Sequence, residues 1–196
     1  AQATSSKNYD EFQSDDEIRD LLSDKPNSIL AVKMAHCTGP QNSGVAEGSV
    51  DALQLAENNW KKLRNTPLLR NAQDVLWVYR ISEPAPGKRF QLGLGGMAKT
   101  AEIRTEETPH GTIIRNEGIK LSKAQGRADL IKKIKAYIGT VNLAVEDKSG
   151  RVLAALKTYS EKRSSDYETR DEDGWLHQVW LIDQESERSA MSALVA

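Results

Sequence analysis

The segment Val75–Ile81, with the sequence VLWVYRI, most constrains the fold of this chain. Most of its residues are β-branched or aromatic, which is typical of a β-strand. A turn-forming sequence at Glu83–Gly87, EPAPG, separates it from the apolar stretch Phe90–Leu94. We therefore expect a β-hairpin in this part of the chain.

Strand-like and helix-like segments mix along the rest of the chain without strict alternation. Short apolar runs predict further strands at Ile29–Met34, Thr112–Ile114, Val141–Val145 and Leu176–Ile182. Apolar residues at helical spacing predict helices at Ser49–Leu63, Ser122–Tyr137, Arg151–Tyr159 and Gln184–Ala196. The polar stretch Ser160–Asp173 is expected to be a loop. This order predicts an α+β fold with a single mixed sheet and helices packed mainly on one side, rather than a doubly wound sheet.

The N-terminal residues 1–27 are expected to form a mobile polar tail followed by one helix. Ser14, with Glu17 three residues later, predicts the start of that helix as a capping box, and Pro26 predicts its end. An α+β domain is expected at residues 28–185, followed by a C-terminal tail or helix at residues 186–196.

Charge and hydropathy argue against two classes of partner. The chain has 27 Lys and Arg residues against 28 Asp and Glu residues, whereas nucleic-acid-binding domains usually carry a basic excess. Its apolar runs are only as long as strands, and a membrane span needs about 18 apolar residues. We therefore expect neither a nucleic acid nor a membrane as partner.

Cys37 is the only cysteine, so no intrachain disulfide can form and we expect a reducing, cytoplasmic setting. It follows a predicted buried strand, where sites are often found, but an inert buried thiol is favoured over a reactive one. Because the three histidines and the single cysteine show no paired ligand spacing, no metal site is predicted.

The stretch Gly93–Thr100, GLGGMAKT, is similar to a phosphate-binding loop of the form G-x-x-x-x-G-K-[ST]. Ala98 replaces the second glycine, and its Cβ would crowd the close approach of a phosphate. Only Ala101–Thr108 is available for the following helix before Pro109. We favour a glycine-rich strand end that makes room for close packing, with an anion site as the alternative.

A cluster of polar residues follows the predicted strand Thr112–Ile114. Arg115, Asn116 and Glu117 lie at its end, and Lys123 and Arg127 are four residues apart on one face of the next helix. These side chains could bind an anionic group such as phosphate, with Glu117 as catalytic base or clamp. The alternative is a solvated helix face.

His177 is the second candidate catalytic residue. Asp173 precedes it in the sequence, and a histidine held by a carboxylate can act as a general base. Its position within the strand Leu176–Ile182 also fits a hydrogen-bonded structural histidine on a half-buried face. His110, beside Pro109, is expected to lie in a loop.

Several motifs occur in a fixed order between Asn58 and Ile182. WVYR at Trp77–Arg80 is followed by Phe90–Met97, then by HGTIIRNEGIKLSKAQGR at His110–Arg127, and finally by DEDGWLHQVW at Asp171–Trp180. In this order the motifs resemble a family first catalogued as a domain of unknown function, which is related to the ParB/sulfiredoxin superfamily and includes free-serine kinases.

The chain departs from the family pattern at three places. Asn116 stands where the family has a histidine, and Gly126 stands where it has an acidic residue before Arg127. No segment here matches the family's A-D-G-H-H-R box, which handles phosphate. The resemblance therefore implies the middle region of the family fold with the catalytic box missing.

Three functions follow from the resemblance. The first is a small-molecule or nucleotide-binding module. The second is an active kinase that uses ATP or ADP with Mg²⁺ to phosphorylate a small hydroxyl substrate such as free serine, with phosphate and Mg²⁺ held by Glu117, Lys123 and Arg127. The third is a non-catalytic structural or protein-interaction domain. The sequence leaves the identity of the ligand and the oligomeric state open.

Overall fold

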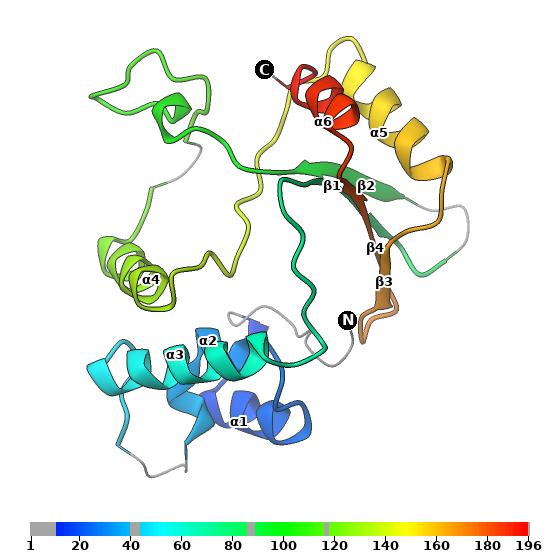
Figure 1. The fold of residues 1–196 in the computed structure, drawn as a ribbon. Coiled ribbons are helices and arrows are strands. Elements are labelled where there is room, and N and C mark those ends of the chain that lie inside the picture. The colour runs from blue at the N-terminus through cyan, green and yellow to red at the C-terminus, as the bar shows by residue number, and fades with distance from the viewer. Residues whose placement is uncertain (1–10, 40–43, 86–88, 116–117, 196) are drawn as a thin grey trace.

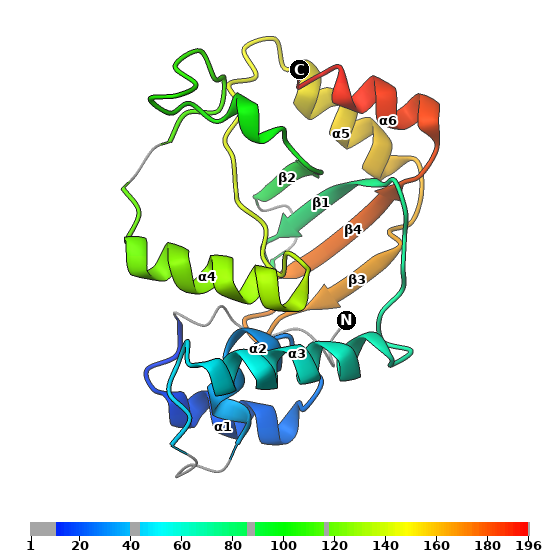
Figure 2. The same cartoon turned by 60° about the vertical axis from the view of Figure 1, so that its left-hand side comes forward.

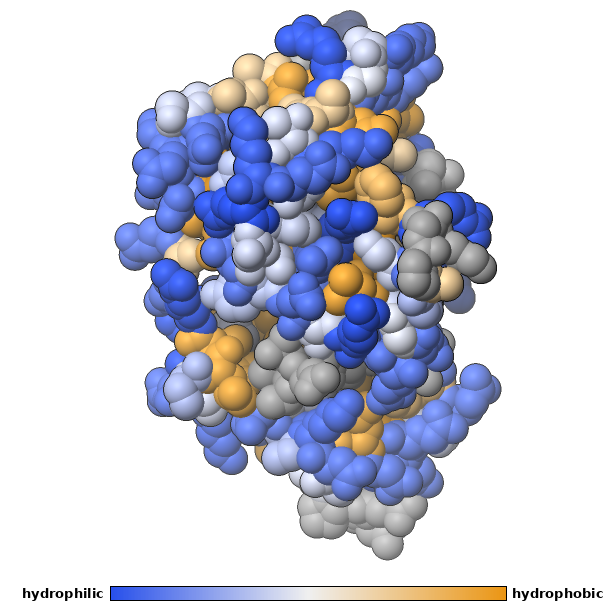
Figure 3. All heavy atoms as spheres, turned by 90° about the vertical axis from the view of Figure 1, so that its right-hand side faces the viewer, coloured by the Kyte–Doolittle hydropathy of each residue, from blue (hydrophilic) through white to orange (hydrophobic). Residues whose placement is uncertain are grey.

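A computed structural model of the chain describes residues 11–39, 44–85, 89–115 and 118–195. Figure 1 shows a group of N-terminal helices and, beyond a linker, a sheet that carries two helices. The face in Figure 3 is mainly hydrophilic, with apolar side chains in scattered patches. Among the described residues, every helix is too short or too polar to cross a bilayer.

The sheet has four strands in the order β2-β1-β4-β3. Strand β1 (Leu76–Ser82) lies between β2 (Phe90–Gly95) and β4 (Leu176–Ile182), and β3 (Tyr167–Arg170) pairs with β4. The predicted α+β class, the hairpin and the strand at Leu176–Ile182 are confirmed. All three pairings are antiparallel, not mixed. The loop predicted at Ser160–Asp173 is wrong at Tyr167–Arg170, which form β3. This segment, YETR, is polar because β3 is an edge strand whose one neighbour is β4.

One face of the sheet forms a hydrophobic core with helices α5 (Arg151–Glu161) and α6 (Glu185–Ser192). Figure 2 shows both helices on the same side of the sheet, as predicted. The register sets Val78 opposite Trp180, and these buried side chains pack with Leu156, Tyr159 and Met191. Since side chains alternate along a strand, Tyr79 and His177 project from the opposite face.

The N-terminal helices are α1 (Asp15–Asp24), α2 (Leu30–Lys33), the 3-10 helix η2 (Ala35–Thr38) and α3 (Val50–Arg64). Both predicted helices here are confirmed. The predicted N-cap also holds, because Ser14 Oγ accepts a hydrogen bond from the Glu17 N–H at 3.4 Å. Buried Ile18 and Leu22 of α1 pack with α2 and η2.

The strand predicted at Ile29–Met34 is wrong, because this run forms α2 with its two caps, Ile29 and Met34. Leu30, Ala31 and Val32 are all buried, with α1 on one side and α3 on the other. A segment buried all round carries no helical stripe, so periodicity does not distinguish it from a buried strand.

The middle of the chain contains helix α4 (Leu121–Ile134). Its buried Ile134 packs with Ala56 and Leu63 of α3, and Lys133 forms an ion pair of 3.1 Å with Glu57. The strands predicted on either side of α4 are not formed. Ile113 makes only an isolated bridge with Ile103. The other predicted strand, Val141–Val145, is exposed and pairs with no described strand. A segment with strand propensity forms a strand only where a neighbouring strand can bond its backbone N–H and C=O groups.

The glycine-rich segment ends β2, as favoured from the sequence. Trp77 of β1 lies over Gly95, where an added Cβ would come within 1.9 Å of the indole atom Cε2. The residues after the strand form only a short 3-10 helix, η3 (Thr100–Glu102), so the segment lacks the long helix of a phosphate-binding loop.

This packing generates a prediction with a matched control. Gly95→Ala is expected to destabilise the protein by about 1–3 kcal/mol, the usual range for overpacking. Gly93→Ala, in the same strand, is expected to be neutral or mildly stabilising, because a Cβ at Gly93 meets no atom within 4 Å. Urea unfolding followed by tryptophan fluorescence measures both. Equal unfolding midpoints for the two variants would contradict this account of the segment.

Candidate functional site

Three polar side chains form a hydrogen-bonded chain on the open face of the sheet, the face opposite α5 and α6. Tyr79 Oη lies 2.6 Å from His177 Nδ1, and His177 Nε2 lies 3.1 Å from Asp171 Oδ2. The phenol and imidazole rings are stacked at 28° with centroids 6.1 Å apart. This chain of tyrosine, histidine and aspartate is the candidate functional site.

Local structure fixes each of the three side chains. Strands β1 and β4 carry Tyr79 and His177 on the same face, because the antiparallel register pairs Tyr79 with Val179. Asp171 lies in the turn between β3 and β4, and its Oδ1 accepts a hydrogen bond from the Trp175 N–H at 2.8 Å. Gly174 has φ of +83° in this turn, a conformation that favours glycine.

The hydrogen bonds determine the protonation of the chain. An ionised carboxylate only accepts hydrogen bonds, so His177 Nε2–H donates to Asp171 and Nδ1 accepts from the Tyr79 hydroxyl. Burial, and then the negative charge of Asp171, raise the pKa of Tyr79. Desolvation acts to raise the pKa of Asp171, but the hydrogen bonds from His177 and Trp175 outweigh it and hold that pKa below its ordinary value.

The chain is accessible from solvent. The side chains of His177 and Asp171 are 24% and 39% exposed, and Tyr79 is 36% exposed. Gly93 is the β2 partner of Tyr79, and the space above it is open. A tyrosine hydroxyl, a histidine that can take its proton and a carboxylate that orients the histidine match the nucleophile, base and orienting group of covalent and acid–base enzymes.

Of the other predicted site residues, the structure describes Lys123, Arg127 and Arg115, and none of them belongs to this hydrogen-bonded chain. Lys123 and Arg127 are exposed on α4, which packs mainly on α3 rather than on β1 or β4. Arg115 is exposed in the segment before α4. Asn116 and Glu117 lie outside the described residues, so their convergence with Lys123 and Arg127 stays a prediction.

The sequence offered His177 as a candidate but indicated neither of its hydrogen-bond partners. Asp173 was expected as the orienting carboxylate, whereas Asp171 occupies that position. Tyr79 lies 98 residues from His177 in the sequence. Its only sequence signal was its place in the strongest predicted strand, and that strand did not reveal its partner.

A second polar cluster lies among the N-terminal helices. His36 Nε2 is 3.1 Å from Asp15 Oδ2, and the ligand atoms of Asp15, His36 and Cys37 all lie within 4.8 Å of one another. Burial, and then the charge of Asp15, raise the pKa of the Cys37 thiol to about 11. The thiol is therefore protonated and a poor nucleophile, as favoured from the sequence.

A cavity of about 410 Å³ adjoins this second cluster. Cys37 and Thr38 line it from η2, Arg19 from α1, and Asn59 and Lys62 from α3. Arg19 Nη1 donates to the carbonyl oxygens of His36 at 3.3 Å and Gly39 at 3.0 Å. These bonds hold η2 against α1.

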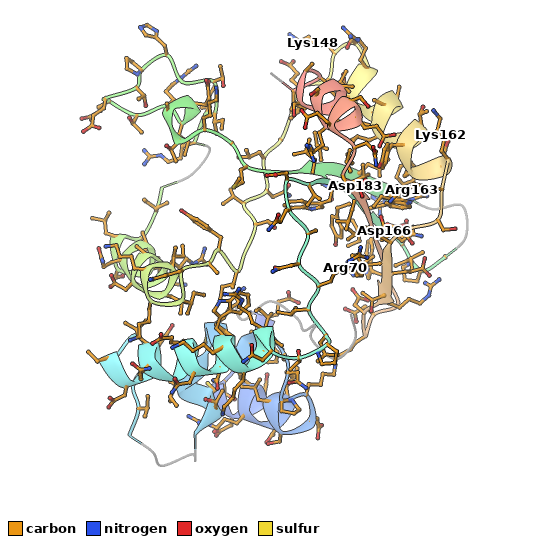
Figure 4. The ribbon with its side chains drawn as sticks, in the orientation of Figure 1. Arg70, Lys148, Lys162, Arg163, Asp166 and Asp183 are labelled. Carbon is orange, nitrogen blue, oxygen red and sulfur yellow. The ribbon has the colours of Figure 1, made fainter. Side chains whose placement is uncertain are left out.

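A third group of charges is structural. Figure 4 shows Arg163 and Asp166 close together in the loop between α5 and β3, with Lys148 well away from them. Asp166 accepts a hydrogen bond from the Leu181 N–H at 2.7 Å, and Arg163 donates to the Leu181 carbonyl at 3.2 Å. These two side chains therefore bond the backbone of β4 at Leu181, beyond the last residue of β4 that pairs with β3, Val179.

Comparison with known proteins identifies a family but no characterised relative. A family model described as "Protein of unknown function (DUF1015)" matches residues 1–196, beyond the middle region in which the sequence showed its resemblance. Searches of the curated proteins and of the solved structures give no significant match. The relation to the ParB/sulfiredoxin superfamily and to serine kinases stays a prediction.

The hydrogen-bond pattern predicts the tautomer of His177. We expect the neutral ring to carry its proton on Nε2 and to leave Nδ1 unprotonated, because Asp171 is the acceptor and Tyr79 the donor. Long-range ¹H–¹⁵N NMR correlations of the imidazole nitrogens measure this directly, with His177→Gln assigning the signals. A ring protonated on Nδ1 would show that the chain of hydrogen bonds runs differently.

The lowered pKa of Asp171 predicts a pH-dependent stability. Ionised Asp171 stabilises the fold above the ordinary aspartate pKa, about 3.9, and this contribution is lost as pH falls through the lower folded-state pKa. Asp171→Asn should therefore be less stable than the wild type at pH 7, with a smaller difference at pH 3. Urea unfolding at both pH values tests this, and a difference that grows on acidification would refute it.

Proposed function

The chain belongs to the DUF1015 family, and we propose that it binds a small polar molecule on the open face of its sheet and moves a proton at a hydroxyl group of that molecule through Tyr79, His177 and Asp171. The proposal rests on one observation, the continuous hydrogen-bonded chain of these three side chains. The proposed function is that of a small-molecule-binding module, the first of the three functions expected from the sequence, with an acid–base step added.

The roles of the three residues follow from their order. Tyr79 is at one end of the chain, and its raised pKa keeps it protonated, with its proton donated to His177 Nδ1. Its oxygen can therefore accept a hydrogen bond from a ligand hydroxyl. When Tyr79 passes its own proton to His177 Nδ1, it takes the proton of the ligand hydroxyl. Asp171 stabilises the imidazolium that forms, as the carboxylate does in a catalytic triad.

A hydroxyl-bearing ligand fits this chemistry better than an isolated phosphate. Phosphoryl transfer relies on cations and Mg²⁺ around the transferred group, and the cations predicted for that role, Lys123 and Arg127, are on α4, which packs mainly on α3 rather than on the sheet. The kinase alternative therefore depends on Glu117. A reducing, cytoplasmic setting, inferred from the single buried Cys37, is part of the same proposal.

A thermal-shift screen with hydroxy amino acids, sugars and nucleotides tests the binding. A ligand at 100 times its Kd should stabilise the protein by about 2.7 kcal/mol, and it should shift the NMR signals of His177 and Tyr79. Gly93→Leu should abolish binding without unfolding the protein, since it fills the open space beside Tyr79. His110→Gln, an exposed loop variant, is the control that should bind as the wild type does.

The outcomes separate the three classes of function. Proton transfer by the site predicts turnover of the bound hydroxyl compound that His177→Gln and Tyr79→Phe reduce by about 10²- to 10⁴-fold. Formation of phosphoserine from serine with ATP or ADP and Mg²⁺, lost in Glu117→Gln but kept in His177→Gln, would replace this proposal by the kinase. A flat screen would favour the non-catalytic interaction domain.

A further inference from the structure

The second polar cluster carries an inference that is independent of the sheet site. It joins the first residue of α1, Asp15, to two neighbouring residues of η2, His36 and Cys37, which are 5% and 3% exposed. We propose that Asp15, His36 and Cys37 bind one Zn²⁺ ion, with the fourth coordination position open toward the adjoining cavity.

The donor atoms suit this ion. Zinc is bound by cysteine sulfur, histidine nitrogen and carboxylate oxygen, usually in a tetrahedron. Zinc–ligand bonds of about 2.0–2.3 Å place such donors about 3.3–3.6 Å apart. His36 Nε2 and Asp15 Oδ2 are already 3.1 Å apart, and all three donors lie within 4.8 Å of one another. Side-chain rotation that brings the donors to this spacing completes the geometry, and the thiolate favours zinc over Mg²⁺ or Ca²⁺.

The surrounding fold holds the donors in place before an ion arrives. Cys37 belongs to the hydrophobic cluster with Ile18 and Leu30, so its sulfur cannot turn out to solvent without breaking that packing. The hydrogen bond from Arg19 Nη1 to the His36 carbonyl, at 3.3 Å, holds the backbone of the second ligand, His36. Pre-positioned ligands are what a metal site requires of its scaffold.

The charges balance when the ion is bound. The Cys37 thiol loses its proton to solvent as the zinc–sulfur bond forms, so one thiolate and one carboxylate neutralise the two charges of the ion. Arg19 is the cation beside the site. Its Nε lies 3.7 Å from Asp16 Oδ1, and the two backbone carbonyls bind its Nη1, so its charge is shared with other partners.

Three protein ligands with one open position are the pattern of a catalytic rather than a closed structural zinc site. Cys37 lines both the cluster and the cavity of about 410 Å³. A water molecule or an anionic small molecule can therefore reach the fourth position, with Arg19 beside it.

Cobalt substitution tests the proposal on the full chain. The protein is first stripped with a chelator, and Co²⁺ is then titrated while the absorption spectrum is recorded. We expect one equivalent to bind, with a thiolate-to-cobalt charge-transfer band and the intense visible bands of tetrahedral cobalt. One equivalent of Zn²⁺ should displace the cobalt and abolish both.

Three variants identify the ligands. Cys37→Ser should lose the charge-transfer band. Asp15 is 53% exposed, and Asp15→Asn keeps the shape of its side chain. This variant should weaken zinc binding by more than about 100-fold, the upper end of the loss seen when a residue that only supports a ligand is changed. His110→Gln should change neither. Circular dichroism is used to check that Asp15→Asn is folded. The absence of a thiolate band in the wild type, or unchanged zinc affinity in folded Asp15→Asn, would overturn the site.

Discussion

The pairing of β1 with β4 is the interaction on which the rest of the sheet region depends. It joins two strands from distant parts of the chain, and its register sets Val78 opposite Trp180. These two side chains enter the core beneath α5 and α6. A slip of one residue would reverse the faces of a strand, so the hydrophobic core also fixes the residues that are displayed on the other side.

The proposed site is a consequence of that constraint. Tyr79 follows a core residue and His177 lies an odd number of positions from Trp180, so both project from the open face. The turn between β3 and β4 then brings the carboxylate of Asp171 to Nε2 of His177. Packing on one face and chemistry on the other are thus set by the same register.

Two parts of the molecule carry chemistry, and they are built differently. The sheet site joins residues that are far apart in the sequence, whereas the cluster at Cys37 joins two short helical elements. An ion pair of 3.6 Å between Lys25 and Glu172 links the two parts beside the turn that holds Asp171. Both side chains are exposed, so this pair contributes little to stability.

The sequence by itself determined the local structure, including the hairpin, the capped helix α1, helices α3 to α6 in outline, and the strand that carries His177. Helix and strand propensities and turn-forming residues act over a few neighbouring positions, so a single sequence is enough to predict their effect. It did not determine the nature of the run Ile29–Met34 or the fate of Val141–Val145, because the neighbours that bury or pair these segments decide their structure. The partners of His177, and the meeting of Asp15 with His36 and Cys37, were decided only by the tertiary structure, because strand register and helix packing bring together side chains whose separation along the chain carries no sign of contact.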